Sequence, residues 1–194
     1  MKKKKDKKGK LVIVSGPSGV GKSTVCREAA GRMKNVYLSV SVTSRPKSKK
    51  EIDGKDYWFV TEEEFRGRIG KGLFLEYAEV FGNMYGTPKD MIEKALEERK
   101  TVILEIDVQG ARQVKALYPD AVMIFILPPS AKELEKRITH RGREKEEMIQ
   151  KRLGEADSEI AAAWQYYKYM IINDDLEQAT EEMIDIVQQS NGGS

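Results

Sequence analysis

Eight residues near the start of the chain form a complete phosphate-loop pattern, G-x-x-x-x-G-K-[ST]: Gly16-Pro17-Ser18-Gly19-Val20-Gly21-Lys22-Ser23. The glycines let successive N–H groups turn toward one point, where the start of a helix adds positive partial charge. Lys22 places an ammonium near the β and γ phosphates, and Ser23 can place its hydroxyl on Mg²⁺. An ordinary glycine-rich turn is the alternative, but an apolar run precedes this pattern and a helix-like stretch follows it. We therefore interpret the segment as a site for a nucleoside triphosphate.

A polar segment further along the chain has the residue types of an anion site. Arg45 lies among hydroxyl side chains, and Tyr57 follows twelve residues later. Arginine binds phosphate with a forked pair of donors, while Tyr57 and Tyr85 offer phenolic O–H groups without adding charge. Taken alone, such a stretch is more often a solvated polar loop.

Glu76 stands between apolar residues in Phe74-Leu75-Glu76-Tyr77. A buried carboxylate there would accept the two N–H donors on the Watson–Crick edge of guanine, which adenine does not present. A surface glutamate on a hairpin explains the local sequence equally well.

Other charged residues suit phosphoryl transfer. Glu105 and Asp107 close the strand 102–107 on one face, at the carboxyl end where parallel sheets bind ligands. Arg137 and Arg141 lie four residues apart on one helix face, and Arg152 follows. A closing lid would bring these guanidinium groups to the transferring phosphoryl; an exposed, salt-bridged face is the ordinary alternative.

Composition narrows the chemistry further. His140 is the only histidine and Cys26 the only cysteine. An intrachain disulfide therefore cannot form, and the single histidine disfavours histidine-dependent triads and multi-histidine metal sites. We expect Cys26 to pack as an apolar group, and the protein to be cytoplasmic. The longest apolar run, 121–127, is far too short to cross a membrane. No signal peptide is expected.

The net charge of +3 is unevenly distributed. Residues 1–10 hold seven lysines against one aspartate, so the rest of the chain is net negative. A terminal lysine block without aromatic residues is typical of a solvated, disordered tail, and we expect no nucleic-acid binding. We treat 191–194 as a flexible terminus.

Alternating apolar runs and amphipathic stretches predict a doubly wound parallel α/β sheet. The expected strands are 11–15, 36–41, 101–106, 122–127 and 169–172; the expected helices are 22–33, 109–118, 131–141, 145–166 and 176–189. Capping boxes are predicted at Thr61 with Glu64 and at Ser130 with Glu133, and Thr87 as the N-cap of a helix reaching about Arg99.

The alternation breaks over about sixty residues, which predicts an inserted lobe. We expect a disordered tail over 1–9 and one domain over 10–190. Its core would be 10–41 and 101–190, its α+β lobe 42–100 and its helical lid about 138–155. The lobe would contain a strand over 57–60 and a hairpin through Phe74–Tyr77 and Tyr85-Gly86. A hinge is expected at Arg141-Gly142-Arg143.

Read together, these segments resemble the guanylate kinases, which transfer the γ-phosphoryl of ATP to GMP. The resemblance runs from about Lys10 to Gln188 and rests on S-G-P-S-G-V-G-K-S, S-V-S-V-T-S-R-P, D-G-K-D-Y-W-F-V, F-L-E-Y-A-E-V-F-G-N-M-Y-G-T, I-D-V-Q-G, I-L-P-P-S, R-I-T-H-R-G and I-I-N-D-D-L. It implies a P-loop fold with Mg²⁺ as cofactor and ATP and GMP as partners. The sequence leaves the oligomeric state open between a monomer and a homodimer.

The resemblance also implies residue roles. ATP would be held by Gly16, Pro17, Ser18, Gly19, Val20, Gly21, Lys22, Ser23 and Thr24, with Asn173 near the adenine and Ser23 on the metal. The guanine would be read by Ser41, Glu76 and Thr87, with Gly86, Glu105 and Asp107 nearby; Arg45, Tyr57 and Tyr85 would hold its phosphate. The catalytic charges would be Lys22, Arg45, Arg137, Arg141 and Arg152.

Two positions depart from the family pattern. Ser48 stands where the family usually has a second arginine, and Glu105 where it usually has an aspartate. Losing a bidentate arginine should weaken the hold on the GMP phosphate, since a lysine restores charge without fork geometry. We expect activity with a raised KM for GMP.

Three alternatives remain. A guanylate-kinase-like module that binds a phosphopeptide with weak or no catalysis would suit Ser48, but has no need of Lys22. A switch GTPase would need an Asn-Lys-x-Asp motif, which the sequence lacks. A kinase for another nucleoside monophosphate would keep the chemistry and change the base.

Overall fold

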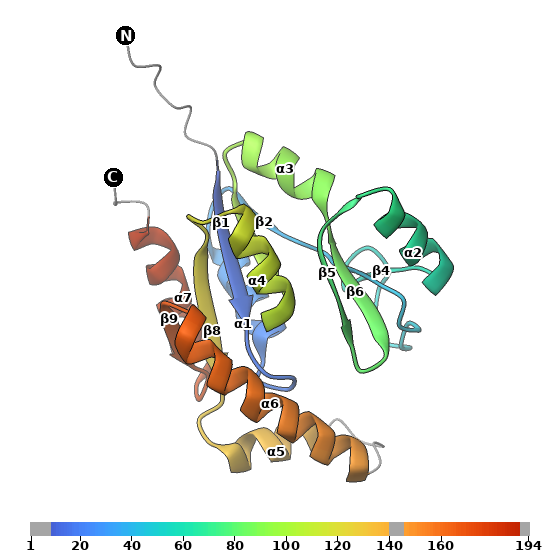
Figure 1. Cartoon of the computed structure of the whole chain (residues 1–194). Coiled ribbons are helices and arrows are strands. Elements are labelled where there is room, and N and C mark those ends of the chain that lie inside the picture. Colours follow the sequence, from blue (N-terminus) through green and yellow to red (C-terminus); the bar gives the residue numbers. More distant parts are fainter. Residues whose placement is uncertain (1–8, 140–145, 191–194) are drawn as a thin grey trace. The chain divides into compact units, whose positions relative to one another are not determined.

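The computed structural model describes residues 9–139 and 146–190 (Figure 1). The predicted lysine tail, the flexible terminus, the Arg141-Gly142-Arg143 hinge, His140 and Arg141 therefore lie outside the described residues. Among the residues described, no helix combines the length and the apolar composition that crossing a membrane requires.

A five-stranded sheet with the order β2-β7-β1-β8-β9 forms the base of the fold. Its strands are β1 (Lys10–Ser15), β2 (Val36–Leu38), β7 (Thr101–Glu105), β8 (Val122–Leu127) and β9 (Tyr169–Ile172). β1 pairs in parallel with β8, β8 with β9, and β2 with β7. The order jumps between strands far apart in sequence, as helical crossovers require, so the predicted doubly wound parallel sheet is confirmed.

Two compact units make up the chain. The first contains Asn35–Leu104 and Gln109–Asp120 with the start of the chain up to Leu11; the second contains Val12–Lys34, Glu105–Val108 and Ala121 onward. The lobe and lid boundaries expected from the sequence remain predictions.

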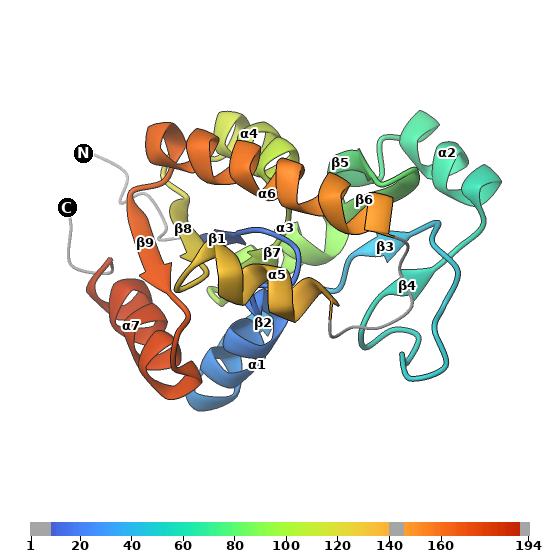
Figure 2. The same cartoon turned by 90° about the horizontal axis from the view of Figure 1, so that it is seen from below.

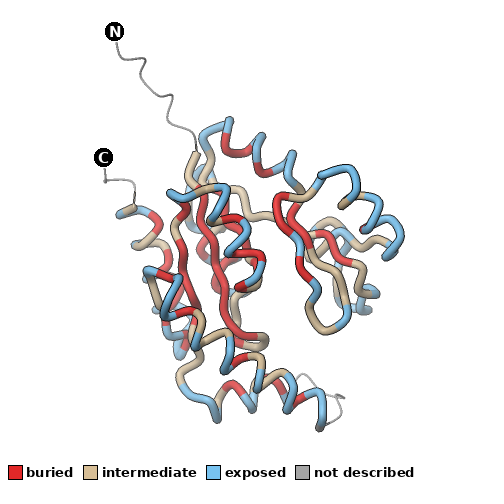
Figure 3. The backbone as a smooth tube through the Cα atoms, in the orientation of Figure 1, coloured by how far each residue is buried: buried red, intermediate tan, exposed pale blue. Residues whose placement is uncertain are grey.

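Among the described residues, the second unit carries most of β1, the strands β8 and β9, and four helices. These are α1 (Lys22–Arg32), α5 (Ala131–Thr139), α6 (Glu146–Tyr166) and α7 (Leu176–Gln189). Seen from below, α6 runs along one face of β8 and β9, while α1 and α7 pack against each other on the opposite face (Figure 2). The β1 and β8 strands are buried along most of their length (Figure 3), because helices cover both faces.

The first unit carries a second sheet with the order β4-β3-β6-β5. Its strands are β3 (Val42–Thr43), β4 (Trp58–Phe59), β5 (Phe74–Val80) and β6 (Asn83–Pro88), and its helices are α2 (Glu62–Gly70), α3 (Lys89–Glu97) and α4 (Val108–Leu117). The Thr61 capping box that opens α2 is present in full. The predicted hairpin is the antiparallel pair β5–β6.

Two local predictions were wrong. The strand expected over 36–41 stops at Leu38, because the chain leaves the parallel sheet there and Val42–Thr43 pair with β6 and β4 instead. Thr87 does not cap α3, whose N-cap is Pro88. Thr87 lies on β6, and its hydroxyl is engaged by a carboxylate.

Candidate functional site

The phosphate loop joins β1 to α1, and its backbone requires glycine. Gly16, Gly19 and Gly21 have φ angles of 151°, 87° and 98°. A Cβ on Gly16 would collide with the carbonyl oxygen of Ile126, and one on Gly21 would lie 2.5 Å from Nδ2 of Asn173. Side chains at these two positions are therefore excluded by both conformation and space.

The start of α1 is arranged to attract an anion. Its N-cap, Gly21, supplies no side-chain acceptor, and the first turn holds no acidic residue. The N-terminal N–H groups thus keep their positive partial charge for a ligand. The ammonium of Lys22 donates to the carbonyl oxygens of Gly16 and Pro17, so it lies over the loop that contains Ser18 and Val20. Thr24 follows in the first turn and is exposed.

Ser23, on the first turn of α1, is hydrogen-bonded to Glu105 at the end of β7. The Ser23 hydroxyl donates to Oε1 of Glu105 at 2.6 Å, although the two residues lie 82 positions apart. Glu105 ends β7, and Asp107 follows just beyond the strand. A hydroxyl and a carboxylate are the hard oxygen donors that Mg²⁺ prefers. The chemistry of these two side chains therefore fits a magnesium ion.

Cys26 lies on α1 and is fully buried, as predicted. Burial raises the pKa of its thiol well above the ordinary value, and the nearby Glu105 carboxylate adds to that effect. The thiol stays protonated near neutral pH, so Cys26 packs as an apolar group and is not a nucleophile.

Arg137 and Asn173 both contact the phosphate loop. Nη1 of Arg137 donates to the carbonyl oxygen of Asn173 at 3.1 Å and to that of Val20 at 3.4 Å. The buried Asn173 side chain donates to the same Val20 oxygen at 2.7 Å. The structure thus brings these two predicted residues to the loop. Arg152 lies on α6 and is partly buried.

Glu159 on α6 is a partly buried acid that the sequence analysis did not single out. Its pKa is raised to about 7, mainly by burial; the Lys22 ammonium acts against this shift, and the Asp107 and Glu155 carboxylates add to it. A single acid in a helix of alternating charge gave no signal in the sequence, because its burial depends on how α6 packs.

In the first unit, Glu76 is a buried acid, with 4% of its surface exposed. The Thr87 hydroxyl donates to Oε1 of Glu76 at 2.6 Å, and the two residues are directly paired across β5 and β6. From the local sequence, Glu76 could equally have been an exposed or a buried residue. The structure shows that it is buried. Ser41 immediately precedes β3, and its carbonyl oxygen accepts from the Trp58 amide.

Arg45, Tyr57 and Tyr85 also come together. The Arg45 guanidinium lies 5.5 Å from the centre of the Tyr57 ring, and the two tyrosine rings are 5.8 Å apart. A hydrogen bond to Glu51 raises the pKa of Arg45, with a smaller contribution from Tyr85. Gly86 follows on β6, where an added Cβ would meet the rings of Phe74 and Phe65 at 2.9–3.0 Å.

Glu51 is the second acid that the sequence analysis missed. It accepts from both terminal nitrogens of Arg45, at 3.1 and 2.5 Å, and from the backbone N–H of Ser48 at 2.8 Å. Arg45 holds the pKa of this carboxyl below its usual range. In the sequence, Glu51 is simply an acidic residue six positions after Arg45. This spacing does not predict a contact, because the contact depends on the conformation of the loop between the two residues.

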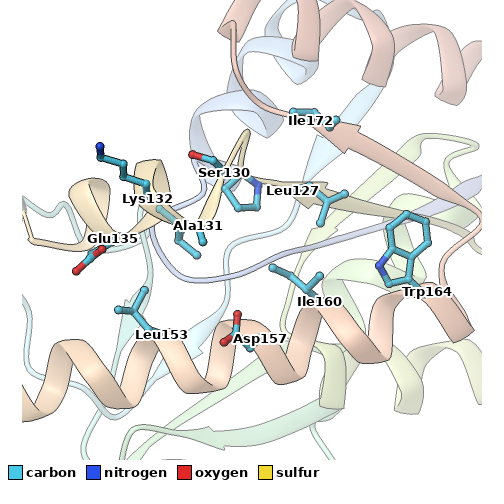
Figure 4. Close-up of a pocket in the computed structure, with 12 residues that line it drawn as sticks. Leu127, Ser130, Ala131, Lys132, Glu135, Leu153, Asp157, Ile160, Trp164 and Ile172 are labelled. Atoms are coloured by element: carbon cyan, nitrogen blue, oxygen red, sulfur yellow. The ribbon is translucent and has the colours of Figure 1, made fainter.

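A cavity of about 530 Å³ opens in the second unit between α5 and α6 (Figure 4). Leu153, Asp157, Ile160 and Trp164 face it from α6. None of the predicted site residues lines it. Its charged lining consists of two carboxylates and one ammonium, from Glu135, Asp157 and Lys132, which does not suit a polyphosphate.

Comparison with known proteins adds independent evidence. The family model described as guanylate kinase matches residues 8–190. A guanylate kinase of Carboxydothermus hydrogenoformans is 51% identical over 176 residues, covering 91% of this chain and 86% of that protein. One from Thermosynechococcus vestitus is 50% identical, covering 88% and 89%. The crystal structure of guanylate kinase from Anaplasma phagocytophilum superposes with a TM-score of 0.81 at 34% identity, covering 97% and 89%.

Proposed function

The chain belongs to the guanylate kinase family, and from this membership we propose that it transfers the γ-phosphoryl group of ATP to GMP. The products are ADP and GDP. The observation that carries the proposal within the structure is the buried Glu76 carboxylate, paired with the Thr87 hydroxyl in the first unit. An acid buried in this way is costly unless it recognises a donor, and guanine presents two donors side by side.

The phosphate loop holds the triphosphate of ATP. The N–H groups at the start of α1 and those of the loop donate hydrogen bonds to the phosphate oxygens, and Lys22 exchanges its contacts with the loop carbonyls for the phosphates. Ser23, with Glu105 hydrogen-bonded to it, would hold Mg²⁺. When bound, the ion neutralises charge on the β and γ phosphates. Asn173 lies against the loop at Val20, with Arg137 hydrogen-bonded to its carbonyl oxygen, and it contacts the adenine of ATP.

The first unit binds GMP. Glu76 accepts from N1–H and the 2-amino group of guanine, and it keeps the Thr87 hydrogen bond, because a carboxylate offers about four lone-pair sites. Gly86 lies on β6 opposite Val42, and Ser41 immediately precedes β3. Arg45, Tyr57 and Tyr85 bind the phosphate, which takes the place that the Glu51 carboxylate occupies at the Arg45 fork.

The reaction is a direct in-line displacement. An oxygen of the GMP phosphate attacks the γ-phosphorus, the bond to the β–γ bridging oxygen breaks, and ADP leaves with the electron pair. Lys22, Arg137, Arg141 and Arg152 neutralise the developing charge. The attacking phosphate is already anionic near neutral pH, so a histidine or cysteine is not needed.

A coupled assay of ADP release tests the proposal. With ATP and Mg²⁺, we expect turnover that depends on GMP and is far slower with AMP, CMP or UMP at the same concentration. No GMP-dependent turnover at millimolar GMP would overturn the proposal. The phosphopeptide-binding alternative is not favoured, because relatives at half identity over most of the chain are guanylate kinases and the loop retains Lys22 and Ser23.

A further inference from the structure

The side chain of Gln113 on α4 pairs with the backbone of β5 in the first unit. Its Nε2 donates to the carbonyl oxygen of Tyr77 at 2.8 Å, and its Oε1 accepts from the Tyr77 N–H at 3.4 Å. One side-chain amide thus engages both polar groups of one residue. The residue it engages directly follows Glu76.

The strand order explains why this contact exists. β5 is an edge strand in the sheet β4-β3-β6-β5, so alternate residues turn their N–H and C=O groups away from β6. Such outward-facing groups need partners or water. A primary amide carries one donor and one acceptor side by side, which matches the peptide groups of an extended residue. Gln113 therefore pairs with β5 as a neighbouring strand would.

The contact falls where β5 is irregular. Its pairing with β6 shifts register between Phe74 and Glu76, with Phe74 opposite Pro88 and Glu76 opposite Thr87. Because of this shift, Leu75 and Glu76 are both buried although they are adjacent, with 6% and 4% exposed. An irregular edge strand is held less firmly by its one partner strand. Gln113 supplies a second support one residue after the shift.

We propose that Gln113 is a positioning residue for guanine recognition, which fixes β5 so that the Glu76 carboxylate is held at the guanine edge. The inference rests on the proposed function, since it assumes that Glu76 reads guanine. Gln113 acts on base recognition through the Tyr77 backbone, to which it is hydrogen-bonded. The effect is therefore confined to selection of the base, and ATP binding is unaffected.

The test compares GMP with IMP, whose base keeps N1–H but lacks the 2-amino group. A displaced Glu76 loses two contacts with GMP and one with IMP, so the ratio of kcat/KM for GMP to that for IMP falls. For Gln113→Ala we expect kcat/KM for GMP to drop about threefold to tenfold, with a smaller drop for IMP and an unchanged KM for ATP. Gln188→Ala, at an exposed glutamine on α7, is the matched control and should change neither value.

Gln113→Glu separates hydrogen bonding from packing. The variant keeps the size of the side chain but sets a carboxylate against the Tyr77 carbonyl oxygen, so we expect it to lower the GMP-to-IMP ratio as Gln113→Ala does. A wild-type ratio in both variants would overturn the inference, and so would equal losses for GMP and IMP. Glu76→Gln shows where a failure lies: if it leaves the ratio unchanged, the base-reading role fails together with that of Gln113.

Discussion

The carboxylate of Glu51 closes the fork of Arg45, accepting from Nη1 at 3.1 Å and from Nη2 at 2.5 Å. Both side chains are mostly buried, with 22% and 28% of their surfaces exposed. A phosphate uses the same two guanidinium donors. Glu51 therefore occupies the position at Arg45 that the GMP phosphate takes in the proposed function.

Glu51→Gln should lower the KM for GMP. The amide has no negative charge and one acceptor oxygen, so it competes less well with phosphate for Arg45. A partly buried ion pair worth about 1 kcal/mol corresponds to about a fivefold lower KM, with kcat unchanged. Steady-state kinetics at varied GMP measures this, with Glu63→Gln on the exposed surface of α2 as the control. A higher KM in Glu51→Gln would mean that Glu51 orients Arg45 for the substrate.

Lys22→Ala should lower kcat by about 100-fold or more. The substitution removes the only side-chain charge within the phosphate loop, and with it charge stabilisation in the transition state. The neighbouring carbonyls of Gly16 and Pro17 lose a donor, so thermal unfolding should be measured in parallel. Near-normal kcat in a folded variant would remove Lys22 from the catalytic set.

Glu76→Gln should abolish the preference for GMP over AMP. The amide has one acceptor oxygen and adds donors, so it cannot accept both N–H groups of guanine. Competition between the two monophosphates, read as the ratio of their kcat/KM values, measures the effect. We expect the ratio to fall by about 100-fold, because a hydrogen bond to a charged group is worth about 1.5–3 kcal/mol. An unchanged ratio would contradict the role of Glu76.

Glu159→Gln should stabilise the protein at pH 8 but not at pH 4. The pKa of Glu159 is raised to about 7 in the folded protein, whereas an unfolded glutamate titrates near pH 4.3. The unfolded state therefore releases its proton first, and the contribution of Glu159 to stability falls as the pH rises from about 4.3 to 7. The difference between these two pKa values corresponds to a penalty of about 3.7 kcal/mol above pH 7, and the variant lacks it.

Urea unfolding at several pH values measures this difference. Glu181→Gln, which removes an exposed carboxylate from α7, controls for the change in net charge. If Glu159→Gln shifts stability equally at pH 4 and pH 8, the folded carboxyl does not have a raised pKa.

Much of the fold could be predicted from the sequence, because local patterns determined it. The apolar strand, the glycines at fixed spacing and Lys22 predict β1, the phosphate loop and α1 without tertiary information. The two local errors arose where tertiary pairing overrode such patterns. Thr87-Pro88 has the composition of a helix start, but pairing with Glu76 keeps Thr87 on a strand.

The site was predictable only in part. Residue types identified Arg45 and Glu76 as candidates, but not whether Glu76 was buried. Glu51 and Gln113 could not be found, since one acts across an irregular loop and the other through the backbone of a distant strand. Spacing along the chain carries no information about either contact.

The most direct test of the account is a crystal structure of the protein with GMP bound. We predict that the guanine edge lies on the Glu76 carboxylate and that the phosphate lies on Arg45, Tyr57 and Tyr85, with Glu51 displaced from the Arg45 fork. A complex in which the guanine makes no contact with Glu76, while Glu51 stays on Arg45, would contradict it.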